Sequence, residues 1–128
     1  MRWETLDRDL EHRLPELSAG LDRERQLWAP DPPGQDIVLG DVLVPYVLQL
    51  MRTASTHSDE LRRALAVVDD LAANPDPKLE WLAVISVLEA LEDHPELLER
   101  SLQWLGPAAR SRLPTREWVR IHADASRD

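Results

Sequence analysis

GDVLVPYVLQLM, residues 40–51, is the most apolar stretch of the chain, and it has a proline near its middle. It shows neither the alternation of a strand nor a one-sided helical pattern, so we expect it to be buried on most sides. A proline inside a central strand would remove a ladder hydrogen bond, and the sequence offers no second convincing strand as a partner. If Asp41 is the N-cap of a helix, Pro45 removes only the hydrogen bond to the carbonyl of Asp41 itself. The stretch therefore predicts a buried helix over about residues 41–52, or one that begins earlier, at Asp36, and is kinked.

The N-terminal residues 3–28 carry an apolar stripe with steps of three, four or seven residues, the spacing of an amphipathic helix. Pro15 interrupts the stripe, because proline lacks an N–H and its ring clashes with the carbonyl of Glu11. We expect two helices that meet near Leu14 and pack on the chain's own core. The segment APDPPGQ, residues 29–35, has no periodicity and predicts a stiff loop.

Capping residues and prolines mark the later helices. A segment that begins with Ser58 as its cap places apolar side chains on one face. Asp76 and Pro77 suit the N-cap and the first position of the next helix. We expect this helix to be nearly apolar all round, apart from a narrow polar strip of Ser86, Glu89 and Asp93. Pro95 opens a further helix, which we expect to close at Gly106.

The tryptophans divide into two groups by their place in this pattern. Trp81 and Trp104 fall on apolar helices, and we predict that they lie in the core. The others are near loops or termini, where a partly exposed indole could anchor a partner, although core packing is the simpler expectation. These are Trp3, Trp28 and Trp118. The C-terminal segments supply further expected packing residues: Leu113, Trp118, Val119 and Ile121.

Together these segments predict an all-α fold of about six to seven helices, either a bundle or a short stack of helical hairpins. A chain of 128 residues suits one domain with a core of its own. Within it we expect four regions along the chain: N-terminal helices over 1–28, the Pro-rich loop over 29–35, a helical core over 36–123 and a tail over 124–128.

Charge is the strongest compositional signal. The chain has 24 acidic and 15 basic residues, and residues 29–99 alone carry 14 acids and 4 bases, a net charge of −10. Such a surface disfavours direct binding to nucleic acid and attracts a basic protein partner. It also keeps a small protein soluble, which is the simpler interpretation of the charge. No apolar leader or membrane-length run is present, so we expect a soluble cytoplasmic protein that does not bind membranes.

The sequence gives little support for catalysis. With no cysteine, thiolate zinc sites and cysteine nucleophiles are excluded. Asp9 and His12 share a helical face, but a carboxylate-bridged metal site needs a second such pair, which the sequence lacks. Near His94, capping of a helix by His94 or Asp93 is favoured over a site. We therefore expect no enzyme activity, no cofactor and no metal.

Two turn signals, ANPDP at residues 73–77 and EDHPE at residues 92–96, introduce helices about twenty residues apart. The segment LAANPDPKLEWLAVISVLEAL, residues 71–91, resembles the HEAT-type pattern of a helix end, an Asp-rich turn and a mostly apolar second helix. At the level of helix spacing, residues 41–106 also resemble small all-helical immunity proteins of bacterial polymorphic toxin systems. The resemblance implies a protein that binds and neutralises a basic toxin.

The expected contact face is the acidic edge of the middle helices. It consists of Asp69, Asp70, Glu89, Glu92, Asp93 and Glu96. Two alternatives remain open: a homo-oligomeric scaffold that uses the stripe of residues 1–28, and a small metal-dependent enzyme with a site at Asp9 and His12.

Overall fold

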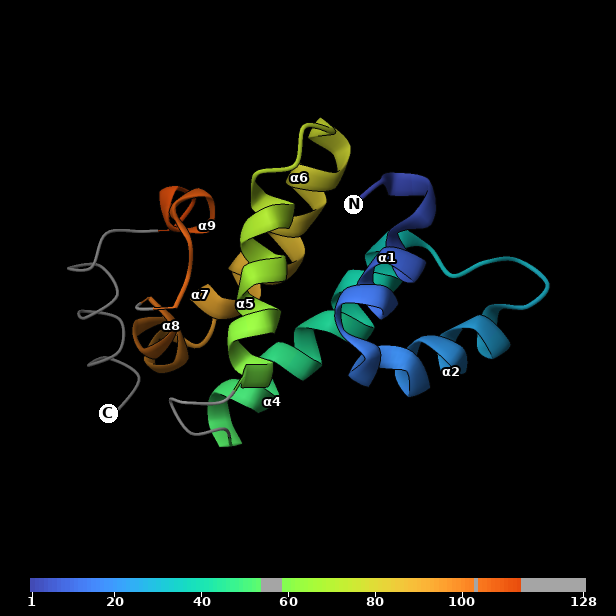
Figure 1. Cartoon of the computed structure of the whole chain (residues 1–128), viewed down its shortest axis with the longest axis horizontal. Coiled ribbons are helices and arrows are strands. Elements are labelled where there is room, and N and C mark those ends of the chain that lie inside the picture. The colour runs from blue at the N-terminus through green and yellow to red at the C-terminus, as the bar shows by residue number, and fades with distance from the viewer. Residues whose placement is uncertain (54–58, 103, 114–128) are drawn as a thin grey trace.

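The computed structural model describes residues 1–53, 59–102 and 104–113. Within these ranges the chain is helical without any strand, and its helices join into seven continuous segments (Figure 1). The segments cover residues 3–13, 15–28, 35–53, 59–72, 77–92, 95–101 and 107–111. The predicted all-α fold of about six to seven helices is confirmed.

The N-terminal stripe folds as two helical segments. The first comprises η1 (Trp3–Thr5) and α1 (Leu6–Arg13), and the second comprises η2 (Pro15–Leu17) and α2 (Ser18–Trp28). Leu14 lies between them, as predicted, because Pro15 starts the 3₁₀ turn of η2 and cannot continue α1. Five leucines of the stripe are buried: Leu6, Leu10, Leu14, Leu17 and Leu21.

The apolar stretch lies in the third segment, which runs through α3 (Gln35–Ile37), η3 (Val38–Leu43) and α4 (Val44–Thr53). The predicted helix is confirmed there, but the expected burial on most sides is wrong. Asp41, Pro45 and Gln49 are exposed at intervals of four residues, which makes the helix one-sided. The start at residue 41 is wrong, because the N-cap is Gly34. The alternative start at Asp36 differs from the observed one by one residue.

The middle of this helix is a π-helix rather than an α-helix. The N–H of Val44 donates to the carbonyl of Leu39, five residues back. Asp41 therefore lies inside the helix and does not cap it. Pro45 comes directly after this bond, and since it has no N–H, the return from i−5 to i−4 bonding occurs where no donor needs a carbonyl.

The remaining helices follow the prolines of the sequence. They are α5 (Asp59–Ala72), α6 (Pro77–Ala83), η4 (Val84–Leu88), α7 (Glu89–Glu92), α8 (Pro95–Ser101) and α9 (Pro107–Ser111). Asp76 is the predicted N-cap, and its side chain accepts a hydrogen bond from the N–H of Lys78 at 3.0 Å. The expected closure at Gly106 is wrong, because α8 ends at Ser101 and Gly106 is the N-cap of α9.

Helix α5 lies at the centre of the molecule, between the α1–α2 pair and the α8–α9 end (Figure 1). It contacts α1, α4, α6 and α9, and the π-helices η3 and η4 pack against each other. Its apolar face is buried as predicted, and the residues concerned are Leu61, Ala64, Leu65, Val68, Leu71 and Ala72. No described helix is both long and apolar enough to cross a membrane.

The tryptophans depart from the prediction. Trp81 is 63% exposed and Trp28 is 47% exposed, so the core placement expected for both is wrong. Trp3 and Trp104 are partly buried and pack against the core, as does the predicted packing residue Leu113. Four residues for which predictions were made lie outside the described residues: Ser58, Trp118, Val119 and Ile121.

Candidate protein-binding surface

The six predicted contact residues do not form one face. Two of them lie on α5, and the other four lie in α7, at its C-cap and in the first turn of α8. The two on α5 are Asp69 and Asp70. The other four are Glu89, Glu92, Asp93 and Glu96, which we call the junction acids.

Asp69 and Asp70 are engaged within the chain. The Oδ1 atom of Asp69 accepts a hydrogen bond from the backbone N–H of Ala109 at 2.9 Å, which fastens α9 to α5. Its carboxylate also lies so close to Gly106 that a Cβ there would fall 2.3 Å from the Asp69 Cγ. Asp70 forms an ion pair with Arg13 of α1. Both side chains therefore have partners within the chain, whereas the prediction of a contact face took them to be free for an external partner.

The junction acids have few partners. Among the described residues no lysine or arginine lies within ion-pair distance of any of them, and the nearest basic group is the His94 imidazole, whose Nδ1 lies 4.0 Å from the Glu96 Oε1. Burial raises the pKa of Glu92, and the nearby charges of Glu89 and Asp93 raise it further. Within the described ranges the cluster thus places four carboxylates at a helix junction without a lysine or arginine partner.

Capping does not account for the residues at this junction. His94 occupies the N-cap position of α8, but its side chain makes no capping hydrogen bond, and Asp93 is the C-cap of α7. The backbone carbonyl of His94 accepts hydrogen bonds from the N–H groups of Leu97 and Leu98. The predicted side-chain cap is therefore wrong.

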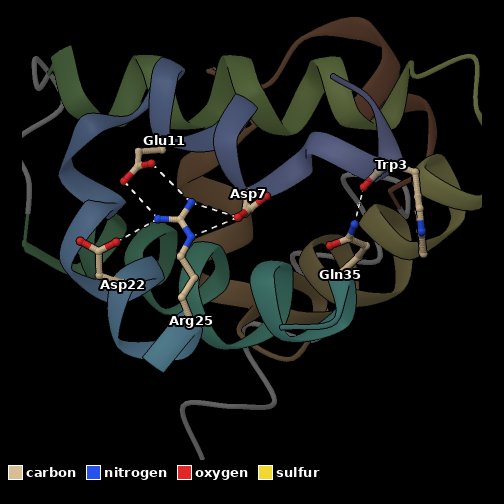
Figure 2. A network of polar contacts seen from close by, with 6 residues as sticks. All are labelled: Trp3, Asp7, Glu11, Asp22, Arg25 and Gln35. Carbon is tan, nitrogen blue, oxygen red and sulfur yellow. Dashed lines mark hydrogen bonds and ion pairs between the residues drawn. The ribbon is translucent and has the colours of Figure 1, made fainter. Parts of the chain in front are cut away.

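Elsewhere, acidic side chains surround an arginine (Figure 2). Arg25 of α2 donates to Asp7 of α1 through Nε at 3.1 Å and Nη2 at 3.0 Å, and to Asp22 through Nη1 at 2.9 Å. The Nη2 atom also lies 3.4 Å from Glu11. Burial lowers the pKa of Arg25, but the hydrogen bonds to these carboxylates outweigh burial and raise it. The network joins α1 to α2, and three of the chain's acids are paired within it.

A second carboxylate–arginine pair joins the N-terminal helices to α5. Arg63 donates to Glu16 of η2, and this hydrogen bond holds the pKa of Glu16 below its usual range. Tyr46 lies close to this pair, and its buried hydroxyl has no hydrogen-bond partner among the described residues. Burial raises the pKa of Tyr46. We interpret Glu16, Arg63 and Tyr46 as residues that stabilise the fold.

The Asp9–His12 pair lies in an open hollow of about 340 Å³ near the N-terminus. The Oδ2 atom of Asp9 accepts hydrogen bonds from the Arg2 N–H at 3.0 Å and from the Thr5 hydroxyl at 2.7 Å, so this carboxylate orders the first turn. In the described part of the chain no group of three or more potential metal ligands comes together. The hollow is lined by Met1, Arg2, Asp9, His12 and Arg13.

Trp81 is the main surface residue that the sequence pattern misplaced. The helix that contains it buries Leu79, Leu82 and Ala83, which leaves Trp81 on the opposite side. The signal is present in the sequence, since a helical projection of residues 77–83 separates position 81 from these three. The prediction missed this separation because the run around Trp81 is almost entirely apolar.

Residues 8–122 match a family described as "Domain of unknown function (DUF7674)". The chain belongs to this family. No curated protein and no solved structure matches it. The description of the family assigns no activity, so the function has to be argued from the surface itself.

Proposed function

We propose that this member of the DUF7674 family is a non-enzymatic protein-binding module, most concretely an immunity protein that binds and neutralises a basic toxin. The junction acids are its contact face. One observation carries the proposal: these acids lie together at one junction, and no described lysine or arginine pairs with them. By contrast, Asp7, Glu16 and Asp70 each pair with an arginine of the chain.

Electrostatics explains how such a face would act. A patch of unpaired carboxylates attracts a basic partner over distances of about a Debye length, ~10 Å at moderate salt, and raises the association rate. Burial raises the pKa of Glu92 in the free protein, and the charges of Glu89 and Asp93 raise it further. A basic partner would relieve the repulsion among these three acids.

The alternatives receive less support from the same residues. An oligomer built on the N-terminal stripe would need leucines that are buried in the chain's own core, such as Leu10 and Leu14. A metal-dependent enzyme would need Asp9 as a ligand, and one oxygen of this carboxylate already accepts two hydrogen bonds.

The test is capture of partners from the native host with the full chain, washed at low and then at high salt. Three variants are compared: wild type, a junction reversal (Glu89→Lys, Asp93→Lys, Glu96→Lys) and a matched reversal (Asp31→Lys, Asp36→Lys, Asp41→Lys). All six side chains are exposed. In each set one residue lies inside a helix, one lies in the first turn of a helix and one lies outside the helices.

We expect one stoichiometric basic protein to be retained by the wild type and the matched reversal at low salt, and to be lost from the junction reversal. Recovery of the bait alone, or of a partner that both reversals bind equally, would contradict the proposal.

A further inference from the structure

The outer side of helix 77–92 carries a large apolar side chain that the fold does not use. Trp81 is 63% exposed, while its neighbours Leu79 and Leu82 are buried. It lies within a regular helix, capped at its start by Asp76. The indole is therefore presented from a fixed backbone.

The π-helix η4 determines what lies beside Trp81. The N–H of Glu89 donates to the carbonyl of Val84, five residues back, so Glu89 comes one π-turn after Val84 on the same side of the helix. Val84 and Ile85 are partly buried and lie three and four positions after Trp81, one helical turn away. With a rise of about 1.5 Å per residue, Trp81 is about 12 Å along the helix from Glu89.

By their spacing these residues follow one side of the helix, and we call them the outer stripe: Trp81, Val84, Ile85, Glu89 and Asp93. One end is apolar and the other is acidic, and Glu89 and Asp93 are both exposed.

Two other tryptophans show what Trp81 lacks. The Lys78 Nζ lies 5.3 Å from the centroid of the Trp3 ring, and the Arg62 Cζ lies 4.9 Å from that of Trp104. Both indoles are thus covered by cations of the same chain. Among the described residues no cation covers Trp81, and its faces remain available to an external arginine or lysine.

We propose that the outer stripe docks a basic protein segment in which arginines or lysines alternate with apolar side chains, the apolar ones packing on Trp81, Val84 and Ile85 while the cations meet Glu89 and Asp93. The proposal deepens the proposed function and rests on it. Charge complementarity selects this occupant over a symmetric dimer formed through the same stripe, because the second copy would then bring its own acids close to Glu89 and Asp93. A tryptophan next to such a charged rim is the usual composition of a binding hot spot.

The apolar end makes a prediction that the junction acids alone do not make. If binding were only electrostatic, two peptides of equal length and equal positive charge would bind equally well. The outer stripe instead requires the apolar side chains as well.

The experiment compares two such peptides, one of arginine and leucine and one of arginine and glutamine, titrated calorimetrically into the full chain. We expect the arginine–leucine peptide to bind about tenfold more tightly, and Trp81→Ala to remove this advantage. The NMR signal of the Trp81 indole N–H, assigned with Trp81→Phe, should shift with this peptide. Because Trp81 is exposed, its variants should unfold at the wild-type temperature.

Trp28→Ala is the matched control, since Trp28 is exposed at the end of α2 and its Nε1 donates to Glu24 at 3.2 Å. It should leave both affinities unchanged. Equal binding of the two peptides, or equal losses of affinity for the arginine–leucine peptide in Trp81→Ala and Trp28→Ala, would overturn the outer stripe as a docking site. The junction acids would remain the proposed contact face. Failure of both peptides to bind would overturn this contact face together with the outer stripe.

Discussion

Replacing Gly106 by alanine tests whether Asp69 is a structural residue. In the native structure the added Cβ would lie 2.3 Å from the Asp69 Cγ and Oδ2 atoms and 2.6 Å from Oδ1. The carboxylate would have to withdraw and give up its hydrogen bond from Ala109. A hydrogen bond to a charged group contributes about 1.5–3 kcal/mol, so Gly106→Ala should lower the free energy of unfolding by about 2 kcal/mol.

A double-mutant cycle makes this reasoning specific. In an Asp69→Ala background the clash is gone, and two effects of Gly106→Ala oppose each other. Alanine reduces the freedom of the unfolded chain at a backbone conformation it can adopt, but it is a poorer N-cap than glycine, each effect being below about 1 kcal/mol. The cost of Gly106→Ala should therefore fall to near zero, which gives a coupling energy of about 2 kcal/mol.

The assay is equilibrium unfolding in urea, with the midpoint compared at constant m-value. Gly40→Ala is the control, because a Cβ there meets no atom within 4 Å and alanine is the better helix former. A cost of Gly106→Ala that is the same in both backgrounds would refute the assignment of Asp69.

Three further predictions concern other contacts. Arg25→Met should lower the free energy of unfolding by about 1–2 kcal/mol, because it leaves the carboxylates of its network facing one another; a loss too small to resolve in urea unfolding would show that they rearrange at no cost. Because the pKa of Glu16 is lowered in the folded chain, its ionised form stabilises the fold above the usual pKa of a glutamate, and this stability is lost as pH falls through the lowered pKa. Below about pH 4.3 the unfolding temperature of Glu16→Gln should therefore fall less steeply with pH than that of the wild type. Parallel curves of unfolding temperature against pH would contradict this. Asp76→Ala should cost about 1 kcal/mol through loss of the N-cap of α6, measured by the same urea unfolding, and an unchanged midpoint would show that the cap is dispensable.

Most of the fold could be predicted from short-range features of the sequence. The leucine spacing, Pro15 and Asp76 with Pro77 are short-range features, and they predicted helices whose bounds the structure confirms within a few residues. The π-helical turns were not predictable in the same way. A π-turn shifts hydrogen bonds by one residue without changing composition, so residues 38–43 and 84–88 look like ordinary buried helix in the sequence.

The candidate surface was less accessible to sequence reasoning because it depends on tertiary neighbours. Asp69 looked like any exposed acid of an amphipathic helix, yet its partner Ala109 is 40 residues away. The predicted polar strip of Ser86, Glu89 and Asp93 is exposed at Glu89 and Asp93, whereas Ser86 is half-buried. Trp81 was misplaced because the apolar run was interpreted as core throughout, although a helical projection separates position 81 from the buried Leu79 and Leu82.

Whether the junction acids are the contact face is decided by the association rate of the captured basic partner with the purified chain, measured across a range of salt concentrations. We expect the rate to fall steeply with salt for the wild type and for the Asp31, Asp36 and Asp41 reversal. For the Glu89, Asp93 and Glu96 reversal we expect a slow rate that is insensitive to salt. The same rate and the same salt dependence in all three proteins would contradict this expectation.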